Sequence, residues 1–287
     1  MQLLTILAEA EKEKRAVGHF NVSTSDVLMT IVKVARELKQ PVVIGVSEGE
    51  REFIGITQIV ALIRSYRNEY QLPIFLNADH TYSFDKIKQA VEAGFDAVVV
   101  DGTKLTTDEN IKLTKATVDY VKANRAEVVV EGELGFIGTS SKLIETLPTE
   151  VIEAQKNLPS SEEARSFVEK TGVELLAPAV GNIHGMLKNA PDPKLNIDLI
   201  RRIRQAAGVP LVLHGGSGIA NDDFVEAIEA GISLIHINTE IRVAYKEALK
   251  QGLGNDEVAP YKYLQPANEA VKTVVEQRMK LFSRMDS

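Results

Sequence analysis

The chain has 287 residues, of which 44% are hydrophobic and 25% charged, so it can bury a large core. Its net charge of −7 argues against a nucleic-acid partner, and its lack of cysteine excludes disulfides and thiolate zinc sites. Residues 1–15 lack the pattern of a secretory signal, and no apolar run approaches the ~20 residues of a membrane span, so we expect a cytoplasmic protein without a membrane partner.

Along the chain, an amphipathic first helix is followed by short apolar runs that alternate with helical patterns. Most of the runs are nearly continuous Val, Ile and Leu, as in parallel strands that are covered on both faces. The eight runs are 16–22, 41–47, 73–79, 96–102, 127–133, 175–180, 210–214 and 233–239. Segments with a period of 3.6 residues lie between them, at 26–39, 55–70, 106–124 and 196–208.

Eight such units in under 300 residues predict a (β/α)8 TIM barrel that forms one domain over residues 1–287. An open doubly wound sheet is the alternative, but no G-x-G-x-x-G follows the first strand. Capping patterns predict helix starts at Ser83 and at Asn221 or Asp222, and helix ends at Gly94 and Gly231.

The connection at 135–163 is too long for an ordinary loop between a strand and a helix. Loops of this size in compact domains are often lids or binding loops, which predicts a lid-like segment here. The alternative is a surface excursion that contains one short helix.

Barrels of this kind carry their chemistry at the carboxyl ends of the strands, and polar residues gather there in this sequence. The positions at or just after the strand ends are Asn21, Ser47, Asp79, His80, Asp101, Glu133, His184, His214, Asn238 and Thr239.

Three of the chain's five histidines belong to this set, namely His80, His184 and His214. Three neutral imidazoles with a fourth position open are typical of a catalytic zinc site, although imidazole also suits cobalt and iron. The alternative is that each histidine is an ordinary hydrogen-bonded residue at a strand end.

After His214 the chain reads "GGSG" (215–218) and then opens a helix. Bare backbone and a helix N-terminus favour an anion, and barrels often bind phosphate after their seventh and eighth strands. We therefore predict a phosphate site, against the alternative of a plain tight turn. Its candidate residues are Gly185, Lys188, Gly215, Ser217, Asn238 and Thr239.

Asp79 directly precedes His80 at a strand end, where both side chains can face one site. A carboxylate beside a metal can move a proton. Together with a phosphate site, this set indicates a metal that stabilises the enediolate of a ketose phosphate.

Five stretches together resemble the class II, zinc-dependent fructose-bisphosphate aldolases and their tagatose-bisphosphate relatives. They are "NADH" (77–80), "VEGELGFIG" (130–138), "VGNIHGMLK" (180–188), "LVLHGGSG" (211–218) and "HINTE" (236–240), and the likeness extends from residue 19 to residue 282. The resemblance implies a (β/α)8 barrel that catalyses reversible aldol cleavage, with a sugar phosphate as its small-molecule partner.

The resemblance also implies roles for individual residues. His80, His184 and His214 match the zinc ligands, Glu133 matches a carboxylate that holds the zinc in a resting position, and Asp79 matches the acid/base at the C4 oxygen. Gly185, Gly215, Ser217 and Thr239 match the phosphate cradle, and Asn21 and Ser47 match groups that reach the substrate. Asp101 resembles a position near the metal in some members. A monovalent cation (Na⁺ or K⁺) and a homodimer or homotetramer are further implications.

The chain departs from the family pattern at three places. Ser140 and Ser141 stand where a glutamate is expected to remove the C3 proton, and Glu145 and then Glu150 are the nearest replacements. His236 stands where an asparagine is common; it either reaches the substrate beside Asn238 or is a core histidine. Tyr261 replaces an arginine that serves the second phosphate in relatives, and Lys262 is the candidate to compensate.

We therefore expect zinc-dependent cleavage of fructose 1,6-bisphosphate to dihydroxyacetone phosphate and glyceraldehyde 3-phosphate. The alternatives are an aldolase for tagatose 1,6-bisphosphate or for a ketose phosphate with another aldehyde half, and a catalytically silent sugar-phosphate-binding barrel. A metal-dependent hydrolase or isomerase is disfavoured, because His19 is followed by Phe20 where a His-x-His pair would be expected.

Overall fold

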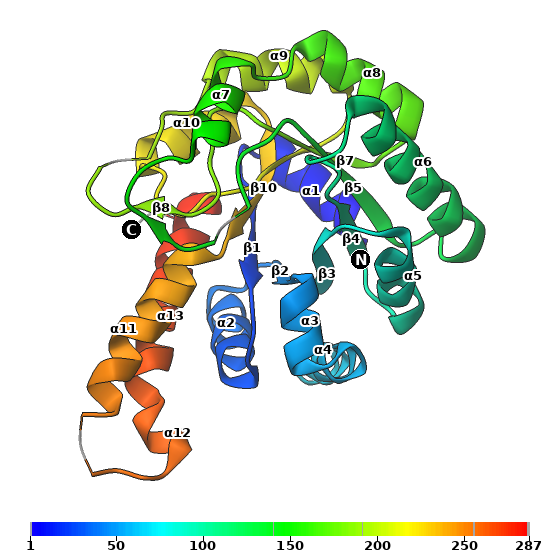
Figure 1. Cartoon of the computed structure of the whole chain (residues 1–287). Helices are drawn as coiled ribbons and strands as arrows, with labels where there is room; N and C mark the ends of the chain where they lie inside the picture. The colour runs from blue at the N-terminus through cyan, green and yellow to red at the C-terminus, as the bar shows by residue number, and fades with distance from the viewer. Residues whose placement is uncertain (1, 140, 191, 255, 286–287) are drawn as a thin grey trace.

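The computed structural model describes residues 2–139, 141–190, 192–254 and 256–285. Eight parallel strands close into a barrel in the order β1-β10-β9-β7-β5-β4-β3-β2, with helices arranged around them (Figure 1). The strands are β1 Val17–Asn21, β2 Val42–Val46, β3 Ile74–Thr81, β4 Ala97–Val100, β5 Val129–Leu134, β7 Leu175–Pro178, β9 Leu211–Leu213 and β10 Ile232–Ile237. This confirms the predicted (β/α)8 barrel.

The predicted periodic segments 26–39, 55–70, 106–124 and 196–208 all form helices, and several further helices lie outside them. They are α1 Leu3–Lys12, α2 Ser25–Leu38, α3 Glu48–Ile54, α4 Ile56–Tyr70, α5 Phe84–Ala93, α6 Thr107–Asn124, α7 Thr149–Lys156, α8 Ser161–Thr171, α9 Ile197–Ala207, α10 Asn221–Ala230, α11 Thr239–Gly252, α12 Pro260–Tyr263 and α13 Gln265–Phe282. Among the described residues, no helix is both long and apolar enough to cross a membrane.

The predicted helix ends are confirmed with one exception. Ser83 caps α5 by accepting a hydrogen bond from the Lys86 amide, and Gly94 and Gly231 follow the last residues of α5 and α10. The start of α10 differs, because Ala220 is its N-cap. Asn221 is already helical, and its side-chain oxygen accepts a hydrogen bond from Arg278 instead of capping the helix.

The interior of the barrel changes character along its axis. Its amino half is apolar and is closed by α1; it contains Leu7 of α1, Val17, Val43, Phe75, Val129, Leu175, Val212 and Leu234. Since side chains alternate between the two faces of a strand, the next interior positions lie two residues further on. These are His19, Gly45, Asn77, Val99, Glu131, Ala177, His214 and His236, and five of the eight are polar.

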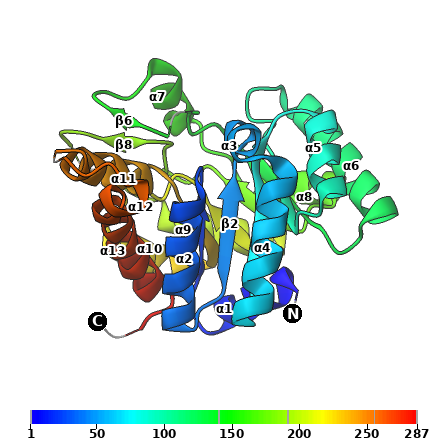
Figure 2. The same cartoon turned by 90° about the horizontal axis from the view of Figure 1, so that it is seen from below.

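The long connection after β5 contains more than the short helix of the alternative interpretation. Besides α7 it forms β6 (Leu143–Ile144), which pairs in parallel with β8 (Met186–Leu187). In Figure 2, α7, β6 and β8 lie at the end of the barrel toward which β2 points, and α1 lies at the opposite end. This position covers the carboxyl ends of the strands, and a lid role for 135–163 stays a prediction.

Candidate active site

A pocket opens at the carboxyl ends of the barrel strands, where the sequence predicts the chemistry. It is lined by Asn21, Asp79, His80, Ser141, His184, Gly185, Gly215, Ser217, His236, Asn238 and Thr239. Ten of these eleven residues are predicted site residues, and the other, Ser141, was noted as a departure from the family pattern. Ser140 lies outside the described residues.

His80, His184 and His214 come together from β3, from the segment after β7 and from the end of β9. Each offers a ring nitrogen such that the three atoms lie within 4.8 Å of one another. The ring centroids are 4.7 Å apart for His80 and His184 and 5.0 Å apart for His80 and His214. Backbone geometry helps to aim one ring, since His80 has a φ of 38°, which is rare for a residue other than glycine.

In each of these imidazoles one ring nitrogen has a hydrogen-bond partner, and the other remains available for a ligand. Nδ1 of His80 lies 2.9 Å from Oδ2 of Asp101, and Nδ1 of His184 lies 2.6 Å from the Gly138 carbonyl oxygen. This leaves Nε2 of His80 and Nε2 of His184 for another ligand. Partners of this kind orient metal-binding histidines and fix their tautomer.

His214 is arranged the opposite way round. Its Nε2 lies 2.6 Å from Oε1 of Glu131, and its buried Nδ1 has no hydrogen-bond partner among the described residues. An unpartnered buried nitrogen is costly unless something binds it. The three donors therefore fit a divalent metal that accepts imidazole ligands.

Glu133 and Asp101 lie beside His80 on the far side of this cluster. Oε1 of Glu133 is 2.9 Å from Nδ1 of His80 and 3.7 Å from Nδ1 of His214. Burial raises the pKa of Glu133, and the neighbouring Asp101 adds to this effect. Burial also opposes the charge on Asp101, but the hydrogen bond with His80 outweighs it and lowers the pKa of Asp101 to about 2.

The protonation of the histidines differs with their surroundings. Burial lowers the pKa of His184 to about 3, so its imidazole is neutral at pH 7. Burial has the same effect on His80, but the charges of Asp79 and Glu133 outweigh it and hold the pKa of His80 well above its ordinary value. A metal would bind the neutral form of this ring, so proton binding at His80 would compete with it.

Asp79 is buried at the pocket wall, where Asn21 holds one of its oxygens. Nδ2 of Asn21 donates a hydrogen bond of 2.8 Å to Oδ2 of Asp79 and one of 3.0 Å to Glu50. Burial opposes the charged carboxylate, but the charge of His80 and the contact with His236 hold the pKa of Asp79 well below its ordinary value. At neutral pH it is therefore a carboxylate that can accept a proton.

The glycine loop after β9 faces the first turn of α11. Gly215 has a φ of 60°, and a side chain there would overlap the Ile183 carbonyl oxygen. Oγ of Ser217 accepts hydrogen bonds from the amides of Asn238 (3.3 Å) and Glu240 (3.1 Å), which joins the two loops. Backbone and the N-terminus of α11 thus line the pocket together, as an anion site requires.

Four predicted site residues do not line this pocket: His214 and Glu133, which lie in or beside the histidine cluster, and Ser47 and Lys188. Ser47 is the N-cap of α3, and its hydroxyl donates a hydrogen bond of 2.9 Å to Glu50. Lys188 follows β8, and its ammonium group lies 3.2 Å from Glu145. Since the Glu145 side chain is 76% exposed, this pair lies at the surface.

Three residues that the sequence analysis missed contact the site. Glu131 is fully buried against His214, and its position two residues before Glu133 on one strand was the available signal. Glu50 is buried between Asn21 and Ser47. Arg242 of α11 donates a hydrogen bond of 2.6 Å to Glu50, and no sequence signal marked it.

Arg242 borders a second cavity, which is also lined by Asn21. This cavity has a volume of about 150 Å³ and is also lined by Ser23, Thr24 and Tyr245. A guanidinium group that lies half-exposed beside the main pocket can bind an anionic group of a substrate.

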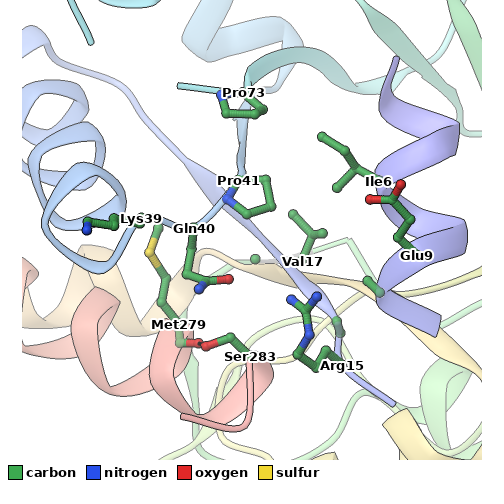
Figure 3. Close-up of a pocket in the computed structure, with 13 residues that line it drawn as sticks. Ile6, Glu9, Arg15, Val17, Lys39, Gln40, Pro41, Pro73, Met279 and Ser283 are labelled. Carbon is green, nitrogen blue, oxygen red and sulfur yellow. Dashed lines mark hydrogen bonds between the residues drawn. The ribbon is translucent and has the colours of Figure 1, made fainter. Parts of the chain in front are cut away.

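A larger cavity of about 340 Å³ lies at the amino end of the barrel. In Figure 3, Ile6 and Glu9 of α1 lie on one side, and Met279 of α13 and Ser283, which directly follows this helix, lie on the other. No histidine lines it, and the metal-binding groups found among the described residues all involve positions of the polar half of the barrel or its carboxyl rim. These observations favour the carboxyl end as the candidate active site.

Comparison with known proteins shows which family the chain resembles. The model of the family "Fructose-bisphosphate aldolase class-II" matches residues 1–287. The fructose-bisphosphate aldolase of Staphylococcus aureus (strain Mu50) is 36% identical over 282 residues, which cover 96% of this chain and 95% of the relative. That of Geobacillus stearothermophilus is 35% identical, with 96% and 94% covered.

Solved structures are similar over almost the whole chain. The YdjI aldolase from Escherichia coli K12 has a TM-score of 0.82 and 29% identity, with 98% of this chain and 96% of that chain covered. A putative fructose-1,6-bisphosphate aldolase from Coccidioides immitis has a TM-score of 0.84 at 24% identity, with the same coverage, which supports the fold alone.

Proposed function

Because the chain belongs to the class II fructose-bisphosphate aldolase family, we propose that it cleaves fructose 1,6-bisphosphate to dihydroxyacetone phosphate and glyceraldehyde 3-phosphate in a zinc-dependent, reversible reaction. Family membership supports aldol cleavage and hence a lyase. The observation that carries the finer proposal is the cluster of His80, His184 and His214, each with a partner on its second nitrogen, beside the buried carboxylate of Asp79.

Under this proposal the metal ligands are Nε2 of His80, Nε2 of His184 and Nδ1 of His214, and Glu133 is an alternative ligand within reach. A zinc ion bound there supplies a Lewis acid that withdraws electrons from the substrate carbonyl. Asp101, Gly138 and Glu131 orient the three rings.

Asp79 moves the proton at the C4 oxygen. In the cleavage direction it accepts the proton of the C4 hydroxyl, the C3–C4 bond breaks, and C4 becomes the aldehyde carbon while the electron pair stays on the C3 side. Asn21 keeps Oδ2 of Asp79 hydrogen-bonded, which fixes the orientation of the carboxylate during this transfer.

The donor phosphate lies on the glycine loop and the N-terminus of α11. Gly185, Gly215, Ser217 and Thr239 line the pocket there, and Asn238 is their neighbour. A monovalent cation (Na⁺ or K⁺) beside this phosphate is part of the proposal, and so are a homodimer or homotetramer and a cytoplasmic location.

The aldehyde half is held differently from the family pattern. Tyr261 lies on α12 with 72% of its surface exposed, and Lys262 is paired with Glu257 at 2.9 Å. Arg242 stands beside Asn21 instead, so we assign it to the second phosphate. Ser47 supports this side through its hydrogen bond to Glu50.

The carrier of the C3 proton is proposed as Glu145, since serine occupies the expected carboxylate position at Ser141. Substitution of Glu145 by alanine tests this assignment. Proton exchange at C3 of dihydroxyacetone phosphate at the rate of the unaltered enzyme would rule Glu145 out, and Glu150 is the next candidate.

Cleavage assays on the purified protein test the function as a whole. Fructose 1,6-bisphosphate, tagatose 1,6-bisphosphate and fructose 1-phosphate are compared with and without a chelator. We expect cleavage of the first, its loss with the chelator and its return with zinc. Exclusive cleavage of a substrate that lacks the second phosphate would instead identify a different aldehyde half, and zinc binding without any cleavage would favour the silent binding barrel.

A substitution provides the control for the metal. His214→Ala should remove bound zinc and cleavage together. Cleavage that survives the loss of zinc would contradict the mechanism.

A further inference from the structure

Two histidines outside the three-histidine cluster lie stacked inside the barrel. The rings of His19 on β1 and His236 on β10 have centroids 3.4 Å apart and are parallel to within 1°. They come from neighbouring strands at paired positions. His236 also stacks against His214, at 4.0 Å and 24°, so the pair continues directly into the proposed metal site.

The barrel makes space for this pair. His19 is fully buried, and a side chain at Gly45 of β2 would overlap its ring. The side-chain nitrogens of His19 and His236 have no hydrogen-bond partner among the described residues. Burying two rings with four unpartnered nitrogens costs free energy, which points to a role beyond filling the core.

One of these nitrogens faces the proposed acid/base. Nδ1 of His236 lies 3.4 Å from Oδ1 of Asp79, and that oxygen also lacks a hydrogen-bond partner among the described residues. Asn21 already holds the other oxygen, Oδ2. Oδ2 of Asp79 is therefore fixed by a hydrogen bond from Asn21, whereas Oδ1 lies near Nδ1 of His236 without a hydrogen bond.

We propose that His236 and His19 are positioning residues for Asp79. His236, as the tautomer with its proton on Nδ1, donates a hydrogen bond to Oδ1 of Asp79 when substrate fills the pocket, and the stack with His19 holds the ring of His236 in the required plane. Hydrogen bonds at catalytic groups are often long before substrate binds and tighten in the complex, which accounts for the distance of 3.4 Å. This role rests on the proposed function of Asp79 and specifies how its carboxylate is oriented.

A second metal ion is the competing interpretation, because His19, Asp79 and His236 offer ligand atoms within 4.8 Å of one another. The stacking argues against it. The lone pair of an imidazole nitrogen lies in the plane of its ring, so two parallel rings direct their lone pairs along parallel planes and do not converge on one ion. The geometry agrees instead with a hydrogen bond from His236 to Asp79 and with His19 stacking against the ring of His236.

Four variants separate the hydrogen bond from the stack. His236→Phe keeps the ring and removes the donor, whereas His236→Asn removes the ring and keeps an N–H group at a similar distance from the backbone. His19→Phe keeps the stack, and His19→Ala removes it. Each variant is assayed with zinc for cleavage of fructose 1,6-bisphosphate and for exchange of the C3 proton of dihydroxyacetone phosphate with heavy water.

The two assays respond differently to Asp79, because C3 exchange involves no proton transfer at the C4 oxygen. We expect His236→Phe to lower the ratio of the cleavage rate to the exchange rate by about 100-fold, the cost of a misplaced catalytic group. His236→Asn should recover at least ~10-fold of that loss. His19→Ala should lower the ratio by about 10-fold, and His19→Phe should restore it.

Equal losses in both assays, or loss of bound zinc, would overturn the proposal, because the pair would then only support the fold or the metal site. The proposal would also be overturned if the ratio of the two rates in His236→Asn were as low as in His236→Phe, or if the ratio in His19→Phe were as low as in His19→Ala. If the unaltered zinc-loaded protein neither cleaves nor exchanges, the proposed function itself fails and this inference falls with it.

Discussion

Substitution of Glu131 by glutamine tests whether the proposed metal site depends on residues one layer deeper in the barrel. Glu131 is fully buried, and its carboxylate accepts a hydrogen bond of 2.6 Å from Nε2 of His214. Glutamine keeps the shape and an acceptor oxygen but removes the negative charge. Hydrogen bonds to charged groups contribute about 1.5–3 kcal/mol, so the electron density that Glu131 lends to Nδ1 of His214 should fall noticeably.

We expect zinc to bind Glu131→Gln about 10- to 100-fold more weakly, as is typical for the loss of a partner behind a metal-binding histidine. Competition with a chromophoric chelator at pH 7 measures the dissociation constant. Glu174→Gln is the matched control, since Glu174 contacts the amide of Val130 on the same strand and has no contact with the histidines in the described part of the chain. Zinc affinity in Glu131→Gln equal to that of the control would refute the reasoning.

Three further predictions follow from the packing and charge of the site. Gly45→Ala forces a methyl group into the ring of His19 and should lower the free energy of unfolding by about 1–3 kcal/mol. In a His19→Ala background the same substitution should lower it by less. Equal decreases in the two backgrounds, measured by denaturant titration, would refute the overlap. Burial lowers the pKa of His19 from 6.5 to about 4, so the unfolded chain binds a proton first as the pH falls between these values. In the metal-free protein the free energy of unfolding should therefore fall by up to about 3 kcal/mol because of this group, with the whole contribution present above pH 6.5 and lost toward pH 4. Denaturant unfolding at pH 7 and at pH 5 should show a smaller decrease for His19→Phe than for the unaltered protein. Arg242→Met should raise KM for fructose 1,6-bisphosphate by about 10-fold or more while leaving KM for fructose 1-phosphate within about twofold, and equal effects on both would exclude contact with the second phosphate.

The sequence was sufficient to predict the barrel because its strands are covered on both faces. A run such as "DAVVV" (96–100) has no polar side to expose, and it recurs with helices between, which leaves few architectures. The rim residues followed from the same reasoning, because a barrel brings the carboxyl ends of all its strands to one place. His80 and His184, 104 positions apart, thus end with ring centroids 4.7 Å from each other.

What the sequence could not predict depends on contacts between particular side chains. Ser47 has the expected position at the end of β2, yet it is the N-cap of α3, and its amide and hydroxyl both donate hydrogen bonds to Glu50, because a helix begins directly after it. Arg242 lies one turn into α11, where a helix pattern alone does not distinguish a surface arginine from one that lines a cavity beside the site. His19 reads as an ordinary strand residue until the pairing of β1 with β10 sets its ring against that of His236.

The interior of the barrel is polar in its carboxyl half and apolar in its amino half, so the two halves should contribute differently to stability and to the proposed activity. Each histidine of the proposed metal site needs a partner for its second nitrogen, and for His214 that partner is Glu131, which occupies a position where other barrels place an apolar side chain. His19 and His236 occupy two more such positions, so the carboxyl half contributes little apolar burial. The amino half, closed by α1 with Leu7 fully buried, must therefore carry much of the stability of the interior. It follows that substitutions in the polar half should alter metal affinity and catalysis more than they alter unfolding, and that truncations around Leu7 should do the reverse.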